Sequence, residues 1–263
     1  MTVFIGTSGW QYRHWRERFY PRGLPTAEWL PYFAARFATV EANGTFYRLP
    51  ERSTFEAWRE TTPAGFIVAM KASRYLTHVK RLTAPAEPVR LMLDRARGLG
   101  RRLGPVLLQL PPTLECVPDR LRETLEAFPP DVRVAVEFRH RSWFTEEVRE
   151  ILAERGVALC LADRSERELT PEWRTAAWGY VRFHQGRGSP PSCYRPSALE
   201  RWAERLVDLW SERSDVFVYF NNDRGGCALR DAARFGRMLD ARGRGRTRTD
   251  APEDVQGSAG PTV

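Results

Sequence analysis

The chain has 263 residues, of which 42% are apolar, and carries a formal net charge of +8. This length suits one enzyme-sized domain, and no apolar run approaches the roughly 20 residues that span a bilayer. The first strand-like run begins at once, so we expect no secretory signal. The cysteines stand far apart with no CxxC pair, which favours reduced thiols in a cytoplasmic protein; they are Cys116, Cys160, Cys193 and Cys227.

The basic residues are almost all arginine. Only Lys71 and Lys80 are lysine among the 41 basic residues. The net charge favours a polyanionic partner such as nucleic acid. Against this, the positive residues are spread along the chain. The excess of arginine over lysine is also typical of a biased genome composition. A lysine that remains in such a chain is a candidate for chemistry that arginine cannot perform, because an ammonium group can lose its proton.

Eight short apolar runs recur along the chain and predict eight β-strands separated by helix-length segments. This pattern predicts a single-domain α/β protein with a TIM-type (β/α)₈ barrel, whose chemistry sits at the carboxyl ends of the strands. The runs are Val3–Gly6, Thr39–Ala42, Phe66–Met70, Pro105–Leu108, Val132–Val136, Val157–Ala162, Gly179–Phe183 and Val216–Phe220.

The intervening segments predict helices, with the poorest signal after the sixth strand, where only a short turn near Pro171–Arg174 is expected. Capping boxes at Ser53–Glu56 and Ser197–Glu200 predict two helix starts. The other predicted helices are Thr26–Phe37, Pro88–Leu103, Asp119–Phe128, Thr145–Arg155 and Leu229–Arg242. We expect the barrel to occupy residues 1–242 and an Arg/Gly-rich tail, 243–263, to be disordered.

Polar residues end almost every predicted strand, and alternate residues of a strand share a face. The candidate catalytic residues are Glu41, Lys71, Glu137 and His184. The candidate substrate-binding residues are Trp10, Asn43, Tyr47, His78, Gln109, Arg139, Asp163, Arg182, Asn221, Asn222 and Asp223. The alternative is a structural ion-pair network, such as Glu137 with Arg182 or Arg139, because buried ions are costly unless paired.

Two glycine-rich turns follow the last two strands, at Gln185–Gly188 and Asp223–Gly226. In many barrels the loops at these positions bind phosphate through backbone amides. No motif of a zinc protease, a serine hydrolase or a P-loop is present. Some of the carboxylates and His184 suit a divalent metal by type, but nothing in their spacing demands one. We therefore name no metal ligands and leave the cofactor open, with a divalent metal as one alternative.

Six sequence blocks occur in one order and carry a family resemblance. They are Gly6–Trp10, Glu41–Tyr47, Lys71 with Thr77-His78, Gln109–Pro112, Glu137–His140 with Ser142-Trp143, and Tyr219–Asp223. Together they resemble the family called domain of unknown function 72, also known as YecE-like. The resemblance implies a TIM barrel over about residues 3–240, and members have been suggested from their shape to bind nucleic acid like barrel endonucleases. No activity is settled for the family, so that suggestion is an analogy of fold.

Three functions stay open. The first is binding of a phosphate-bearing ligand at the barrel mouth, extending to nucleic acid and phosphodiester hydrolysis. There Glu137 or Glu41 would act as base or metal ligand, and His184 as acid or metal ligand. Lys71, Arg139 and Arg182 would stabilise the anion, and Asn221, Asn222 and Asp223 would orient the substrate. The second is an isomerase- or lyase-type enzyme on a small phosphorylated or sugar-like metabolite, with Lys71 as base or Schiff-base amine. The third is a binding protein without catalysis.

Overall fold

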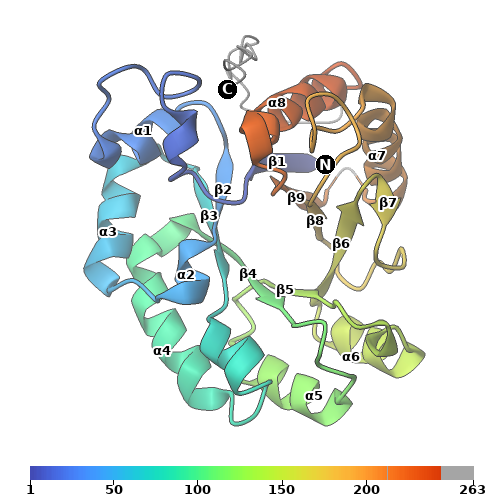
Figure 1. Cartoon of the computed structure of the whole chain (residues 1–263). Coiled ribbons are helices and arrows are strands. Elements are labelled where there is room, and N and C mark those ends of the chain that lie inside the picture. The colour runs from blue at the N-terminus through green and yellow to red at the C-terminus, as the bar shows by residue number, and fades with distance from the viewer. Residues whose placement is uncertain (212, 244–263) are drawn as a thin grey trace.

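The computed structural model describes residues 1–211 and 213–243 and is a (β/α)₈ barrel. Figure 1 shows its strands as a ring with the helices outside it. The eight predicted strands are confirmed, and all eight pair in parallel around the ring. They are β1 (Thr2–Thr7), β2 (Thr39–Ala42), β3 (Ile67–Lys71), β4 (Leu103–Gln109), β5 (Val134–Glu137), β6 (Ala158–Arg164), β8 (Gly179–Phe183) and β9 (Asp215–Phe220). A short ninth strand, β7 (Arg167–Glu168), pairs antiparallel with the end of β6.

The seam of the barrel lies between β1 and β2, which are joined by a single parallel bridge, Ser8 to Glu41. A Cβ atom on Gly6 would lie 1.9 Å from the backbone oxygen of Thr39. Glycine is therefore required for the two strands to approach this closely. Across the same seam, the hydroxyls of Thr39 and Tyr219 are hydrogen-bonded at 2.7 Å.

Helices cover the outside of the ring in chain order (Figure 1). They are α1 (Trp29–Ala34), α3 (Arg52–Thr61), α4 (Ala86–Ala96), α5 (Pro118–Glu126), α6 (Glu146–Glu154), α7 (Pro196–Leu209) and α8 (Cys227–Asp240). The single turn α2 (Gly44–Tyr47) follows β2 directly, at the barrel mouth. Short 3₁₀ turns occupy Arg13–Trp15, Thr26–Glu28, Arg97–Arg102, Arg141–Trp143 and Arg224–Gly226, and a π-helical turn spans Tyr75–Val79. No described helix is long and apolar enough to cross a membrane.

The local structure differs from expectation at two helix starts and agrees with it after β6. Both predicted capping boxes are wrong, because α3 begins at Arg52 and α7 begins at Pro196, and neither has a side-chain cap. Proline favours the first helical turn because it needs no amide partner there, which shifts the start of α7 ahead of Ser197. After β6 the chain forms β7 and then loop, with one hydrogen bond from the Trp173 amide to the Pro171 oxygen.

Two apolar layers position the site. The larger one fills the space between sheet and helices, and the smaller one fills the barrel interior. Small residues on β3, β5 and β6, namely Ala69, Ala135 and Ala158, face this interior beside Tyr180 and Tyr219. The small side chains leave room for large polar ones at the carboxyl end of the barrel.

All four cysteines were expected to be reduced, but two of them are oxidised. Cys193 and Cys227 form a disulfide, which ties the loop after β8 to the first residue of α8, whereas Cys116 and Cys160 are free. Their 34-residue separation gave no local motif. The predicted tail lies almost wholly outside the described residues, which end at Gly243.

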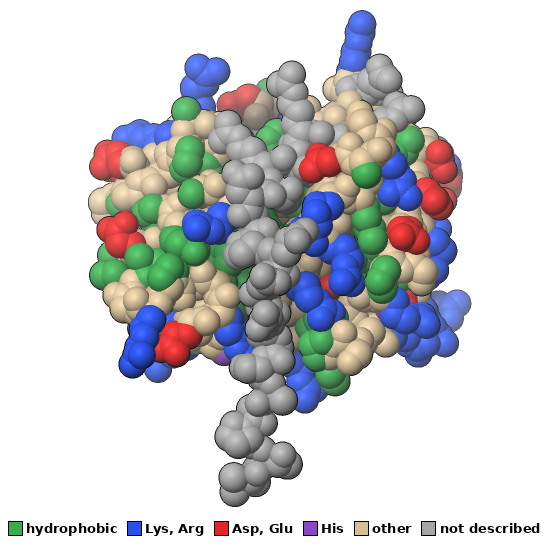
Figure 2. Space-filling view, turned by 90° about the horizontal axis from the view of Figure 1, so that it is seen from above, with side chains coloured by type: hydrophobic (Ala, Val, Ile, Leu, Met, Phe, Trp, Pro, Cys, Tyr) green, Lys and Arg blue, Asp and Glu red, His purple; other side chains and the backbone are tan. Residues whose placement is uncertain are grey.

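Figure 2 shows Lys and Arg side chains interspersed with acidic and apolar ones on the face in view.

Candidate functional site

Charged side chains fill the top of the barrel interior. Glu41, Glu137 and Arg182 come from β2, β5 and β8, and each has 1% or less of its side chain exposed. Arg139 and His184 adjoin them just after β5 and β8. We call these five residues the inner charge cluster. Burial of so many charges is tolerated only because each has a partner of opposite charge or a hydrogen bond.

Arg182 bridges the two carboxylates. Its Nη2 donates to Oε1 of Glu41 at 2.8 Å, and its Nη1 donates to Oε2 of Glu137. The other oxygen of Glu41 accepts a 2.6 Å hydrogen bond from the Tyr180 hydroxyl. Burial alone would lower the pKa of Arg182, but Glu41 and Glu137 outweigh it and hold that pKa well above its ordinary value.

Glu137 is the most heavily bonded member of the cluster. Its Oε1 accepts from Nε of Arg139 at 2.9 Å and lies 3.1 Å from Nε2 of His184. Burial would raise the pKa of Glu137, but Arg182, His184 and Arg139 together hold it well below the ordinary value. The carboxylate is therefore ionised and accepts from each of these partners.

This bonding fixes the tautomer of His184. A carboxylate oxygen can only accept, so Nε2 of His184 carries the proton, and Nδ1 accepts from Nδ2 of Asn221 at 3.2 Å. Burial, the largest influence, lowers the pKa of His184 despite the opposing charge of Glu137. Both ring nitrogens are thus committed, and the neutral imidazole positions Glu137.

Lys71 stands apart from the pairing. It ends β3 and shares its inward-facing side with Ile67 and Ala69. No ion pair or hydrogen bond joins its amine to any described residue, and its Nζ lies 4.2 Å from the centre of the Phe46 ring. Burial and then the charge of Arg182 lower its pKa to about 8, although Glu41 and Glu137 oppose the shift. The mouth therefore holds a half-buried amine that has no hydrogen bond or ion pair with a described residue.

A hollow opens beside Glu137 at the exits of β5 and β6. It has a volume of about 350 Å³ and is lined by Arg139, Arg141 and Arg164, together with Pro112, Glu137, Phe138, Phe144, Ala162 and Leu169. We call it the arginine hollow. Arg141 and Arg164 are exposed and form no ion pair with a described residue. Its one carboxylate, Glu137, is paired with Arg139 and with Arg182, and Arg182 also pairs with Glu41. The charges of Arg141 and Arg164 therefore have no acidic counterpart there, and they make the hollow electropositive.

A second hollow, of about 330 Å³, lies over the exits of β1 and β2. Trp10, Asn43 and Tyr47 line it, and Trp10 packs edge-on against Trp58. Tyr47 is 80% exposed, whereas Asn43 donates to the Ser8 oxygen at 3.2 Å. These predicted binding residues lie on the seam side of the mouth.

Two further predicted residues lie beside the centre of the mouth. His78 packs edge-on against Phe46, whose ring also contacts Lys71. Gln109, at the end of β4, has its Oε1 within 3.5 Å of nitrogens of both Arg139 and Arg182.

Three predicted residues lie away from the inner charge cluster. Asp163 faces the helices and accepts hydrogen bonds from Trp202 and Tyr194. Asn222 likewise turns outward and donates to Asp231 at 2.7 Å. Asp223 accepts from the Trp15 indole at 2.7 Å and pairs with His14, so it anchors the loop after β1. Strand alternation could have predicted the outward orientation of Asp163 and Asn222, because their neighbours Ala162 and Asn221 occupy the inward-facing positions.

The first glycine-rich turn, Gln185–Gly188, does not present the free amides that were expected. The Gly186 and Gly188 amides donate to the oxygens of Ser192 and Cys193, and the Arg187 amide donates to Glu166. A Cβ on Gly186 would lie 2.1 Å from the Cys193 oxygen, so this glycine serves close packing within the loop. In the second turn, the Gly226 amide donates to the Asp223 oxygen.

The donors also bear on metal binding. Within the described residues, no group of three or more His, Cys, Asp or Glu side chains is arranged to hold a metal ion. Both oxygens of Glu41 and of Glu137 already accept from cations, Tyr180 or His184.

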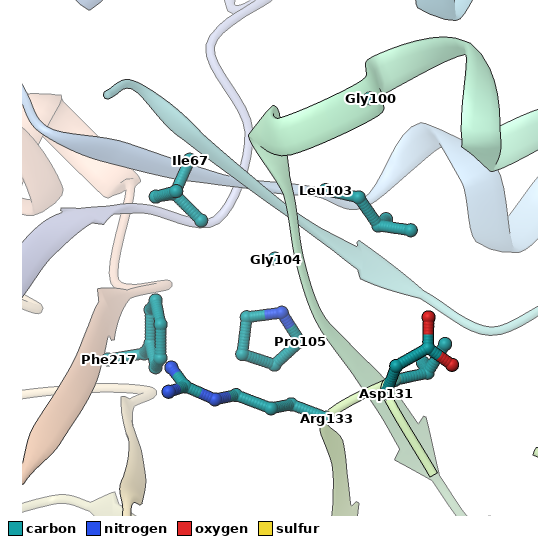
Figure 3. Close-up of a pocket in the computed structure, with 9 residues that line it drawn as sticks. Ile67, Gly100, Leu103, Gly104, Pro105, Asp131, Arg133 and Phe217 are labelled. Atoms are coloured by element: carbon teal, nitrogen blue, oxygen red, sulfur yellow. The ribbon is translucent and has the colours of Figure 1, made fainter. Parts of the chain in front are cut away.

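A cavity of about 270 Å³ occupies the opposite end of the barrel (Figure 3). It is lined by residues at strand starts, among them Ile67 and Leu103. Arg133 reaches across it toward Phe217, as Figure 3 shows, and its charge is paired with Asp215 at 2.8 Å. The amino end of a barrel conventionally serves stability, so we place the candidate site at the other end.

The chain matches the family described as "Protein of unknown function DUF72" over residues 4–256. It belongs to this family. The UPF0759 protein YunF of Bacillus subtilis is 25% identical, with 90% of this chain and 95% of that protein covered. A DUF72 family protein (TM1631) of Thermotoga maritima is 29% identical, with a TM-score of 0.81 over 91% of this chain and all of that one.

More distant structures share the fold. A DUF72 family protein (EF0366) of Enterococcus faecalis is 18% identical, with a TM-score of 0.76 over 91% of this chain and 96% of its own. The structure of SacUVDE is 9% identical, with a TM-score of 0.52 over 83% of this chain and 87% of its own. At this identity the likeness concerns the barrel alone.

Sequence reasoning missed three residues that border the site. Tyr180 is inward-facing on β8 and bonds Glu41, and Arg141 and Arg164 follow β5 and β6 in the arginine hollow. Arg141 and Arg164 could have been found from their position after predicted strands. Arginine is so frequent in this chain, however, that an arginine at such a position does not by itself indicate a site.

Proposed function

We propose that the carboxyl-end mouth of this DUF72 barrel binds a phosphate-bearing ligand. The arginine hollow carries the proposal, because Arg141 and Arg164, which have no ion pair with a described residue, converge there with Arg139, whose charge is matched by Glu137. Arginine presents a planar fork that matches phosphate oxygens in pairs. Lys71 adds a further cation to the mouth with no acidic partner of its own.

The size of the hollow favours a small phosphate ester. About 350 Å³ lies at the lower end of the range for small-molecule sites. The net charge of +8 supports a second candidate, nucleic acid, whose backbone phosphates would engage the same arginines. Phosphodiester hydrolysis has less support, because Glu41, Glu137 and His184 are already saturated by hydrogen bonds. We also propose a cytoplasmic location; because the Cys193–Cys227 disulfide removes the reduced-thiol argument for it, cell fractionation is the test.

Calorimetric titration of the full chain with inorganic phosphate and glycerol phosphate at low salt tests the proposal. We expect Arg141→Gln and Arg164→Gln each to weaken binding about tenfold, since a hydrogen bond to a charged group contributes about 1.5 kcal/mol or more. Arg120→Gln is the matched control, an exposed arginine on α5 with no ion pair to a described residue. Absence of binding, or equal loss in the control, would reject the proposal.

An oligonucleotide titration separates the two candidates. Nucleic-acid binding falls steeply with salt because many counterions are released, whereas binding of one phosphate ester changes far less. A steep salt dependence that is lost in Arg141→Gln and Arg164→Gln would favour nucleic acid. No binding of single-stranded or duplex oligonucleotide at low salt would remove that candidate and leave the small ester.

A further inference from the structure

We infer that Lys71 is a reactive amine that forms an imine with an aldehyde or ketone group of the ligand at the barrel mouth. The inference rests on the proposed function for the phosphate group of that ligand and names its second functional group, a carbonyl. It assigns to Lys71 a covalent role distinct from the anion binding of the arginines.

Lys71 is the unpaired cation of the inward-facing set. Arg182 is held by Glu41 and Glu137, and Arg139 is held by Glu137 at 2.7 Å. Lys71 lies on the same side of the barrel with no acidic partner within 4.0 Å among the described residues, supported by the Phe46 ring. An amine in this position is free to approach a ligand, because no carboxylate has to release it first.

The neighbouring carboxylates partly offset the positive charge of Lys71 without forming an ion pair with its amine. Glu41 lies on β2 in register with Ala69, two residues before Lys71. Its oxygens are bonded to Arg182 and Tyr180, so its charge acts on Lys71 at a distance. A protonated imine at Lys71 would keep the positive charge that this surrounding already accommodates.

The electrostatic setting supplies free amine near neutral pH. With a pKa of about 8, roughly a tenth of Lys71 is unprotonated at pH 7, about 300 times the fraction for an ordinary lysine. Only the unprotonated form attacks a carbonyl carbon. Desolvation by burial and the positive charge of Arg182 are the main causes.

The step is balanced without a redox partner. The Nζ lone pair forms a bond to the carbonyl carbon and gives a carbinolamine, with one proton moving from nitrogen to oxygen. The carbon–oxygen bond then breaks, oxygen leaves as water with the second amine proton, and a carbon–nitrogen double bond remains. Protonation of that nitrogen by solvent gives the iminium form.

The chain offers an internal control, since Lys80 is its only other lysine. Lys80 is exposed and lies 5.7 Å from the Tyr75 ring. We would incubate the intact protein with glyceraldehyde 3-phosphate and sodium cyanoborohydride, which spares the disulfide, and map the reduced adducts by peptide mass spectrometry. We expect Lys71 to be modified at least about tenfold faster than Lys80, with a pH midpoint near 8 and competition by inorganic phosphate.

The variants and a second probe keep the two proposals apart. Lys71→Arg keeps the charge and should abolish the fast adduct, whereas Lys80→Arg should leave it unchanged. Equal modification of both lysines, or slower modification of Lys71, would overturn the imine even if calorimetry shows phosphate binding. If glyceraldehyde without phosphate modifies Lys71 equally fast and phosphate does not compete, the imine stands and the phosphate site fails.

Discussion

Arg182 and Glu41 face each other across the barrel interior, from β8 and β2, with Nη2 of the arginine 2.8 Å from Oε1 of the glutamate. The same guanidinium holds Glu137 from β5. One side chain thus links three strands that lie on different sides of the ring. Since all three groups are buried, removal of the central cation leaves two carboxylates without their main counter-charge.

We expect Arg182→Met to lower the free energy of unfolding by about 3 to 5 kcal/mol, because it leaves buried unpaired charge. Urea unfolding followed by circular dichroism measures the loss. Arg149→Met is the control, since its pair with Glu146 lies at the surface and should contribute little. Similar unfolding midpoints for the two variants would show that the buried arrangement has no special weight.

Lys71→Met should stabilise the protein by about 1 to 3 kcal/mol at pH 7, because a half-buried cation with a lowered pKa disfavours the folded state. Between pH 8 and about 10.5 the folded protein loses the proton before the unfolded chain does. The wild type therefore gains stability as pH rises through that interval, and the advantage of Lys71→Met should shrink. Unfolding curves at pH 7 and pH 10 measure it, and an advantage that grows with pH would contradict the assignment.

Asp231 predicts a pH effect of opposite sign. Burial raises its pKa to about 6, although the Tyr194 amide and Asn222 oppose the shift. The folded state therefore keeps the proton between about pH 4 and 6, and this contribution to stability declines as pH rises through that range. Compared with Asp231→Asn, the wild type should lose about 2 kcal/mol across the interval. Asp119→Asn, at the exposed start of α5, should show no such difference from wild type.

Reduction of the Cys193–Cys227 disulfide should lower the melting temperature, since the bond closes a loop across the top of the barrel. A loop of this length corresponds to about 2 to 4 kcal/mol in the chain-entropy account. Thermal melts with and without dithiothreitol measure the effect. The double variant Cys193→Ser/Cys227→Ser is expected to melt at one temperature in both conditions, and a dithiothreitol effect that persists in it would assign the change to another cause.

The amino-acid sequence by itself determined the fold and the end of the barrel at which polar groups gather. Eight apolar runs at helix-length intervals leave few arrangements other than a closed parallel barrel, because each strand must bury both faces. Strand alternation also determined that residues such as Glu41 and Arg182 face inward. These properties are local or periodic, and so they can be read along the chain.

Only the tertiary structure decided which charges meet. Arg182 lies between Glu41 and Glu137 because the ring brings β2, β5 and β8 around one axis, and no spacing along the chain specifies that meeting. The same holds for the disulfide and for Arg141 and Arg164 in the arginine hollow. Pairing energies depend on distances of a few ångströms between residues far apart in sequence. That geometry also leaves Lys71 without a carboxylate partner among the described residues. The amino-acid composition of the chain gave no sign that this partner would be missing.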